Sequence, residues 1–173
     1  MWRKAREVIL EGVHKDGTFL DVGCANGILL RDLCIWAQEK GITLIPFGID
    51  ISKELVGECK EKIPGFKMNF MVADKYKFKP KRKFTFICTS FDLRGKRGQE
   101  KYLKRYLDML ESGGRLILTR YDDQKDEFIL LEEYLKQMGP KLDFLFVGST
   151  EVHEITKVFW LEKMMDGKTF CLR

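Results

Sequence analysis

Three acids in the first half of the sequence end short apolar runs, a position from which side chains can meet a ligand. Asp21 lies in "FLDVGCANG", Asp50 ends "FGID" and Asp74 ends "FMVAD". Gly23 and Gly27 allow close backbone approaches that a Cβ would obstruct, and a helix beginning after them would present free amide groups. Asp50 follows Gly27 by 23 residues, close to the roughly 20 at which a strand-end acid meets ribose hydroxyls. Three strand-end acids beside a glycine turn are the groups expected to bind an adenosine-bearing ligand.

Strand-like and helix-like patterns alternate around these acids. Strands are expected at 18–22, 44–50, 66–73, 84–90 and 115–122, and helices at 1–13, 28–40, 52–63, 99–111 and 124–138. Asn26 and Ser52 are expected N-caps, and Gly139-Pro140 is the expected end of the last helix. This alternation predicts a parallel α/β sheet with helices on both faces. Ligands of such sheets bind beyond the carboxyl ends of the strands, so the three acids would share one crevice.

Two connections depart from this alternation. Only nine residues, 75–83, lead from Asp74 to the next strand, so a helix there is short or absent. The runs at 142–150 and 155–163 are separated by only "EVHE" and must pair as a hairpin, which makes one strand antiparallel to the rest.

Length and composition predict a single domain over 1–173, with an N-terminal helix within 1–16 that could form a lid, a core at 17–163 and a tail at 164–173. No stretch has the length of a membrane span, so the sequence predicts a cytoplasmic protein with no membrane partner. Five single cysteines and two histidines favour reduced thiols and no metal site.

The positive charge is concentrated in the window 75–105. This window holds twelve Lys or Arg and two acids, whereas the whole chain has a net charge of only +5. A solvated surface explains such a window, and so does an anionic partner such as RNA, with Tyr76 and Phe78 available for stacking on bases.

Taken together, these motifs resemble the class I S-adenosylmethionine-dependent methyltransferases over about 19–163. "FLDVGCANG" is similar to their glycine-rich first motif, "FGID" to their ribose-binding acid and "VAD" to their adenine-side acid. The resemblance implies a Rossmann-like sheet of seven mostly parallel strands and S-adenosyl-L-methionine as cofactor. The cofactor-binding residues that it implies are Asp21, Gly23, Cys24, Ala25, Gly27, Asp50, Ile51, Ala73, Asp74, Thr89 and Ser90.

Two positions depart from the family pattern. Ala25 replaces the middle glycine of the first motif, and "CTSFDL" stands where amino-group methylating members often carry an Asn-Pro-Pro-Tyr-like stretch. Methylation of an adenine or glutamine amide through that motif is therefore not supported. A nicotinamide-binding domain would need Gly-x-Gly-x-x-Gly, and a P-loop would need Gly-Lys-Ser/Thr.

The resemblance implies a methyltransferase of class EC 2.1.1.- acting on an unidentified acceptor, with a small metabolite favoured over RNA. The alternative is a non-catalytic cofactor-binding or partner-binding subunit of the same fold. Transfer needs mainly proximity, and a base is required only for a protonated nucleophile. Asp92 and Tyr121 are the candidate bases, with Asp122 and His153 behind them, and Phe91 is expected beside the pocket. The residues leave the acceptor atom and the oligomeric state open.

Overall fold

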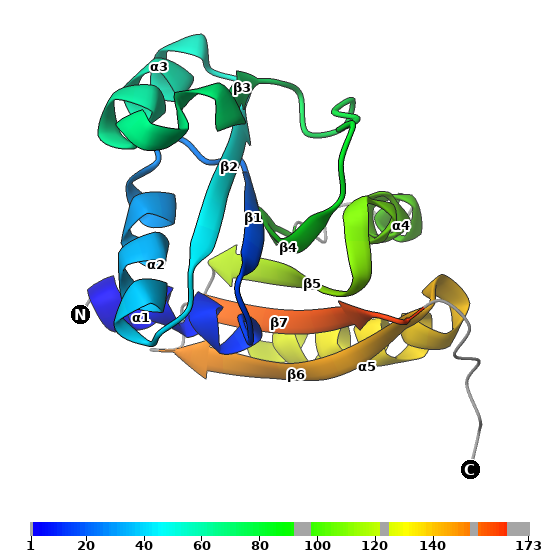
Figure 1. The fold of residues 1–173 in the computed structure, drawn as a ribbon. Helices are drawn as coiled ribbons and strands as arrows, with labels where there is room; N and C mark the ends of the chain where they lie inside the picture. The colour runs from blue at the N-terminus through cyan, green and yellow to red at the C-terminus, as the bar shows by residue number, and fades with distance from the viewer. Residues whose placement is uncertain (1, 92–97, 122–124, 153–155, 166–173) are drawn as a thin grey trace.

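The computed structural model describes residues 2–91, 98–121, 125–152 and 156–165 (Figure 1). The helices are α1 (Trp2–Glu7), η1 (Val8–Gly12, a 3₁₀ helix), α2 (Ile28–Glu39), α3 (Lys53–Lys62), η2 (Pro64–Asn69, also 3₁₀), α4 (Gln99–Met109) and α5 (Lys125–Leu142). The strands are β1 (Gly17–Val22), β2 (Leu44–Asp50), β3 (Phe70–Val72), β4 (Phe84–Ser90), β5 (Leu110–Tyr121), β6 (Phe144–Val152) and β7 (Thr156–Lys163). Each strand and helix expected between residues 17 and 163 has a counterpart, in the same order.

The seven strands form one sheet in the order β3-β2-β1-β4-β5-β7-β6. β7 is antiparallel to both its neighbours, β5 and β6, and the remaining neighbours pair in parallel. The predicted Rossmann-like, mostly parallel sheet with a C-terminal hairpin is therefore confirmed. The chain builds outward from β1 to β3 and then adds β4 on the other side of β1, so the strand order reverses between β1 and β4. Beyond the carboxyl ends of the strands, this reversal leaves the crevice in which such sheets bind ligands.

Helices cover both faces of the sheet, as Figure 1 shows. On one face η1, α2 and α3 pack against strand residues such as Phe19 and Phe86. On the other, α4 and α5 pack against residues such as Leu20 and Leu116. Phe19 and Leu20 belong to opposite apolar layers because successive side chains of a strand point to opposite faces of the sheet.

The connection from β3 to β4 contains no helix, as its length predicts. The face that α4 and α5 cover is therefore open along the β2–β3 edge, where Ile45 is 41% and Met71 is 43% exposed. The guanidinium of Arg82 lies 4.8 Å from the centre of the Phe47 ring and covers part of this edge. The connection thus lies on the surface between the β2–β3 edge and α4 (Figure 1).

The third strand is shorter than predicted. The strand expected over 66–73 is reduced to the three residues of β3, because the chain before it forms η2. The side-chain amide of Asn69 donates to the carbonyl of Pro46 over 2.9 Å, which holds η2 against β2. Pairing with β2 therefore begins only after this bond.

Two helix ends also differ from the predicted ones. β5 begins at Leu110, within the helix expected to run to residue 111, and the register between β4 and β5 is irregular there. α5 runs through Pro140 to Leu142, although proline lacks the amide that would bond within the helix. Leu142 packs on the apolar layer beneath α5, which favours this last turn. Among the described residues, no helix is long and apolar enough to cross a membrane.

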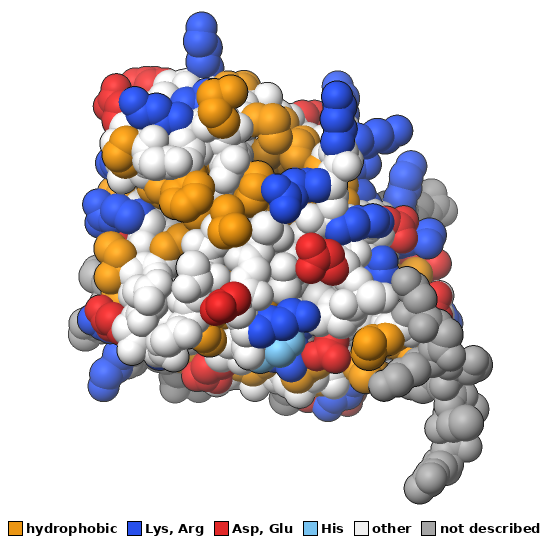
Figure 2. Space-filling model, in the orientation of Figure 1, with side chains coloured by type: hydrophobic (Ala, Val, Ile, Leu, Met, Phe, Trp, Pro, Cys, Tyr) orange, Lys and Arg blue, Asp and Glu red, His pale blue; other side chains and the backbone are white. Residues whose placement is uncertain are grey.

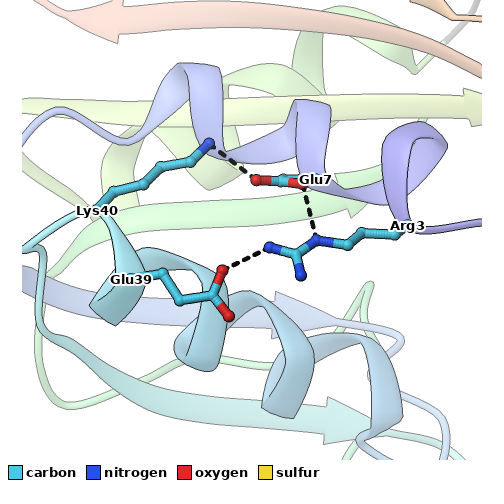
Figure 3. Close-up of polar contacts among 4 residues, drawn as sticks. All are labelled: Arg3, Glu7, Glu39 and Lys40. Carbon is cyan, nitrogen blue, oxygen red and sulfur yellow. Dashed lines mark hydrogen bonds and ion pairs between the residues drawn. The ribbon is translucent and has the colours of Figure 1, made fainter.

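The N-terminal segment lies beside the C-terminal end of α2, as Figure 3 shows. Glu7 accepts from Arg3 over 3.1 Å and pairs with Lys40 over 3.2 Å, and Arg3 also pairs with Glu39. The twelve residues of α2 separate these contacts from the glycine turn by about 18 Å. In this structure α1 lies at the C-terminal end of α2, and its role as a lid stays a prediction.

We expect Gly12→Ala to destabilise the fold by about 1 to 3 kcal/mol, because a larger residue there overpacks the core. A Cβ at this position would lie 2.2 Å from Cδ1 of Trp160 and 3.1 Å from Cδ1 of Ile117, and both side chains are buried. Gly57→Ala is the matched control: a Cβ there meets nothing within 4 Å, and alanine should stabilise α3 by up to about 1 kcal/mol. Urea unfolding measures both. Equal stability of the two variants would contradict the packing of η1 on the sheet.

Candidate functional site

The glycine turn crosses from the end of β1 to the start of α2 and is held to β2 by its backbone. The amides of Gly23 and Cys24 both donate to the carbonyl of Ile49, over 2.8 and 3.0 Å. Gly27, with φ of +75°, is the N-cap of α2 in place of the predicted Asn26. A Cβ at Gly27 would lie 2.4 Å from Sγ of Cys59, so both conformation and space require glycine there.

The side chain of Asp50 connects this turn to the end of β2 by a hydrogen bond. Its Oδ2 accepts from the amide of Ala25 over 2.9 Å, and its Oδ1 accepts from the amide of Ser52 over 2.9 Å. Ser52 is the N-cap of α3, as predicted, and accepts from the amide of Leu55 over 3.3 Å. One carboxylate therefore joins the glycine turn, β2 and the start of α3. Each carboxylate oxygen retains a further lone pair with which to accept a ligand hydroxyl.

Asp74 organises the turn that replaces a helix after β3. Its Oδ1 accepts from the amide of Tyr76 over 2.8 Å, and its carbonyl accepts from the amides of Lys77 and Phe78, both over 2.9 Å. Its Oδ2 has no hydrogen-bond partner within the part of the chain that the structure describes. That oxygen is available to a donor on a ligand.

A pocket of about 340 Å³ opens where these segments meet, at the carboxyl ends of β1, β2 and β3. It is lined by Gly23, Ile49, Asp50, Ile51, Ala73, Asp74, Lys75 and Tyr76. Five of these are predicted cofactor-binding residues: Gly23, Asp50, Ile51, Ala73 and Asp74. Sequence reasoning placed Lys75 and Tyr76 only in the basic window and missed Ile49, which lies one residue before the acid.

Three other predicted residues lie around the turn and not among those that line the pocket. Asp21 and Cys24 are buried, and Ala25 is exposed with φ of +46°. Burial, and secondarily the charge of Asp50, raises the pKa of Asp21 to about 7. The side chain of Cys24 packs against Gly48, where a Cβ would lie 2.8 Å from its Sγ. Asp21 and Cys24 therefore lie beneath the turn, whereas Ala25 is on its surface. Contact of these three residues with a cofactor stays a prediction.

An aromatic group stands at the carboxyl end of β4. The Tyr102 hydroxyl lies 2.9 Å from Oγ1 of Thr89 and donates to the carbonyl of Ser90 over 3.1 Å. Its ring centre lies 6.0 Å from that of Tyr76 and 5.8 Å from that of the buried Phe91. Thr89 is also buried, and its hydroxyl hydrogen-bonds to that of Tyr102. Burial raises the pKa of Tyr102, which therefore keeps its proton at neutral pH.

Tyr102 was not among the predicted site residues. Its place in the helix expected at 99–111 gave no signal of a hydroxyl that reaches β4, because this contact joins two different elements, 13 residues apart in the sequence. The Nζ of Lys75 lies 5.2 Å from the centre of the Tyr76 ring and 6.0 Å from that of Tyr102. A positive charge and two tyrosine rings therefore border the cofactor side of the crevice.

The structure does not locate a general base. Asp92, Asp122 and His153 lie outside the described residues. Tyr121 ends β5, but its side chain is not described. The assignment of Asp92 and Tyr121 as candidate bases stays a prediction.

A family model described as "Methyltransferase domain" matches residues 1–153. The N-methyltransferase NodS from Bradyrhizobium japonicum WM9 is similar in structure, with a TM-score of 0.68 and 14% identity, over 94% of this chain and 96% of that one. Its complex with S-adenosyl-L-homocysteine gives a TM-score of 0.69 at 14% identity, over 93% of this chain and 86% of that one.

Two further solved structures share the fold. A SAM-dependent methyltransferase from Aquifex aeolicus has a TM-score of 0.65 at 20% identity, over 91% of this chain and 88% of that one. The [4+2]-cyclase SpnF has a TM-score of 0.69 at 13% identity, over 94% of this chain and 81% of that one. At these identities the likeness shows the fold alone. No curated protein matches the chain.

Asp50→Ala should weaken binding of S-adenosyl-L-homocysteine by about 1.5 to 3 kcal/mol, the usual value of hydrogen bonds to a charged group. Asp16→Ala is the matched control, because Asp16 also accepts from a backbone amide, that of Thr43 over 2.7 Å, but does so before β1 and β2 begin. Calorimetry on both folded variants makes the comparison. Unchanged affinity in Asp50→Ala would contradict a role for this acid in cofactor binding.

Asp21→Asn should become more stable relative to the unchanged protein as pH rises from about 5 to 8. Burial raises the pKa of Asp21 to about 7, against about 3.9 when unfolded, so the folded state holds a proton that the unfolded state has released. Stability from this group is full at low pH and is lost as pH rises through the folded pKa. Asparagine does not titrate. Urea unfolding across this range measures the difference, and a difference that does not change with pH would contradict the raised pKa.

Proposed function

The chain belongs to the family of methyltransferase domains, whose methyl donor is S-adenosylmethionine, and from this premise we propose that it methylates an acceptor bound beside the carboxyl end of β4. The single observation that carries the proposal is the pocket that unites Gly23, Asp50 and Asp74 from the ends of three adjacent strands. A tight turn alone would not require two acids at the next two strand ends.

The residues of the pocket fit this cofactor. Nothing lies within 4 Å of the position that a Cβ would take at Gly23, so a ligand can lie directly against the backbone of the turn. Asp50 would accept from the ribose hydroxyls through its remaining lone pairs. The Oδ2 of Asp74, which has no partner among the described residues, would accept from an exocyclic amine. The volume of about 340 Å³ lies within the usual range for small-molecule pockets.

The cofactor supplies a methyl group already activated by its sulfonium, so the protein's task is positioning. Holding an acceptor close and in line with that methyl group accounts for most of the required rate. Tyr76 and Tyr102 offer planar surfaces, and Lys75 offers a positive charge next to them. These contacts suit a planar acceptor that carries negative charge, either a small metabolite or a nucleotide of RNA.

A non-catalytic role as a cofactor-binding or partner-binding subunit is the alternative, because a fold alone shows neither which reaction a protein catalyses nor that it catalyses one. The structure of the [4+2]-cyclase SpnF is similar over 94% of this chain. Turnover must therefore be measured separately from binding.

We expect calorimetry to show binding of S-adenosylmethionine and no binding of NAD. The acid before the glycine turn and the spacing of its glycines differ from a nicotinamide site. Incubation with small planar anions and with RNA should then release S-adenosylhomocysteine with at least one acceptor. Binding of NAD in place of S-adenosylmethionine would contradict the proposed cofactor. Cofactor binding without turnover on either class of acceptor would favour the non-catalytic role.

A further inference from the structure

A second hollow, which we call the basic pocket, lies between residues 79–83 and α4. The basic pocket has a volume of about 470 Å³. Its lining residues are Lys79, Pro80, Lys81, Arg82, Lys83, Lys101, Lys104, Arg105, Asp108 and Met109. Seven of these ten residues are cationic and one is anionic, so the basic pocket carries a strong positive charge.

Protein groups balance only a small part of this charge. Lys79, Lys81 and Lys101 are exposed and have no hydrogen-bond or ion-pair partner in the described ranges. Lys104 pairs with Asp108 over 3.6 Å, but Asp108 is the pocket's one acid. Uncompensated cations around a concave surface attract anions to it.

Arg105 also lines the basic pocket. One of its terminal nitrogens donates to the carbonyl of Phe78, which fixes the guanidinium between the connection and α4. Its Nε is shielded from solvent and has no hydrogen-bond partner in the described part of the chain. What Arg105 contributes to the basic pocket is therefore its positive charge, held in place by the bond to Phe78.

The basic pocket extends to the end of β4 that is remote from the cofactor pocket. Lys83 directly precedes β4, and the cofactor pocket lies beyond the carboxyl ends of the parallel strands. The two pockets share no lining residue. A ligand that contacts both must extend beyond the cofactor pocket.

The connection from β3 to β4 links the two pockets. Lys75 and Tyr76 line the cofactor pocket, Lys79 and Lys81 line the basic pocket, and the exposed Lys77 lies between them in sequence. Figure 2 shows Lys and Arg side chains gathered over this connection and α4, at the upper right of the molecule. The ligand that matches this path is a chain of regularly spaced negative charges.

We propose that the acceptor is RNA, whose backbone phosphates bind in the basic pocket while one nucleotide reaches the cofactor pocket. This inference rests on the proposed function and names its substrate class. Lysine is a point-charge ligand for phosphate, and the Tyr76 side chain, in a residue 61% exposed, is available to stack on a base.

Fluorescence anisotropy with a labelled single-stranded RNA of mixed sequence and about 20 nucleotides, longer than one typical binding groove, tests the proposal. The affinity should fall steeply with salt, with a log-log slope of about −0.7 for each phosphate contact. The variant Lys79→Gln/Lys81→Gln/Lys101→Gln should reduce the magnitude of this slope by about 2 and weaken binding at low salt by at least tenfold.

The matched control removes three exposed lysines on other parts of the chain, Lys15→Gln/Lys53→Gln/Lys67→Gln. We expect it to keep the slope of the unchanged protein. An equal loss in the control would overturn the proposal, since net charge alone would then explain the binding.

Calorimetry with S-adenosylhomocysteine on all three proteins separates this proposal from the proposed function. We expect equal cofactor affinity in each. If the cofactor binds but RNA does not bind at low salt, the RNA proposal is overturned and the proposed function stands. Binding of phosphatidylserine vesicles through the same lysines, without RNA binding, would also overturn it.

Discussion

The site depends on the two backbone bonds that Asp50 accepts. The turn after β1 contains Ala25 at φ of +46°, a conformation that non-glycine residues rarely adopt. The bond from the Ala25 amide to Oδ2 of Asp50 holds it there, while Oδ1 fixes the start of α3. Without this carboxylate, neither the turn nor α3 would have its present support at the end of β2. The acid that would bind the cofactor thus also builds the wall against which the cofactor would lie.

The second constraint is the short connection from β3 to β4. Because it has no helix, Asp74 closes a local turn that brings Lys75 and Tyr76 to the cofactor pocket. The same lack of cover leaves Met71 and the lysines of the connection on the surface beside α4. One short segment therefore shapes both the open side of the cofactor pocket and the basic pocket.

The sequence predicted what depends on local pattern and missed what depends on distant contacts. The order of the elements, the antiparallel hairpin and the Ser52 cap follow from periodicity and capping chemistry. The shortened β3 depends on a bond between Asn69 and Pro46, 23 residues apart, and no local pattern reports it. Likewise, the sequence predicted the strand-end acids. It did not predict that the amide of Ala25 donates to Asp50, because every residue except proline has a backbone amide that could donate. The composition of residues 75–105 showed the excess of positive charge. The basic pocket could not be predicted from composition, because it forms only where α4 packs beside residues 79–83.

The central claim is that the glycine turn and the ends of β2 and β3 form the cofactor pocket. The most direct measurement is an NMR titration of the isotope-labelled protein with S-adenosylhomocysteine, following backbone amides. The account predicts that the largest shift changes fall on Gly23, Ala25, Ile51 and Lys75, with little change at Lys101 and Lys104 on α4. Shift changes confined to α4 and residues 79–83, with the glycine turn unaffected, would contradict it.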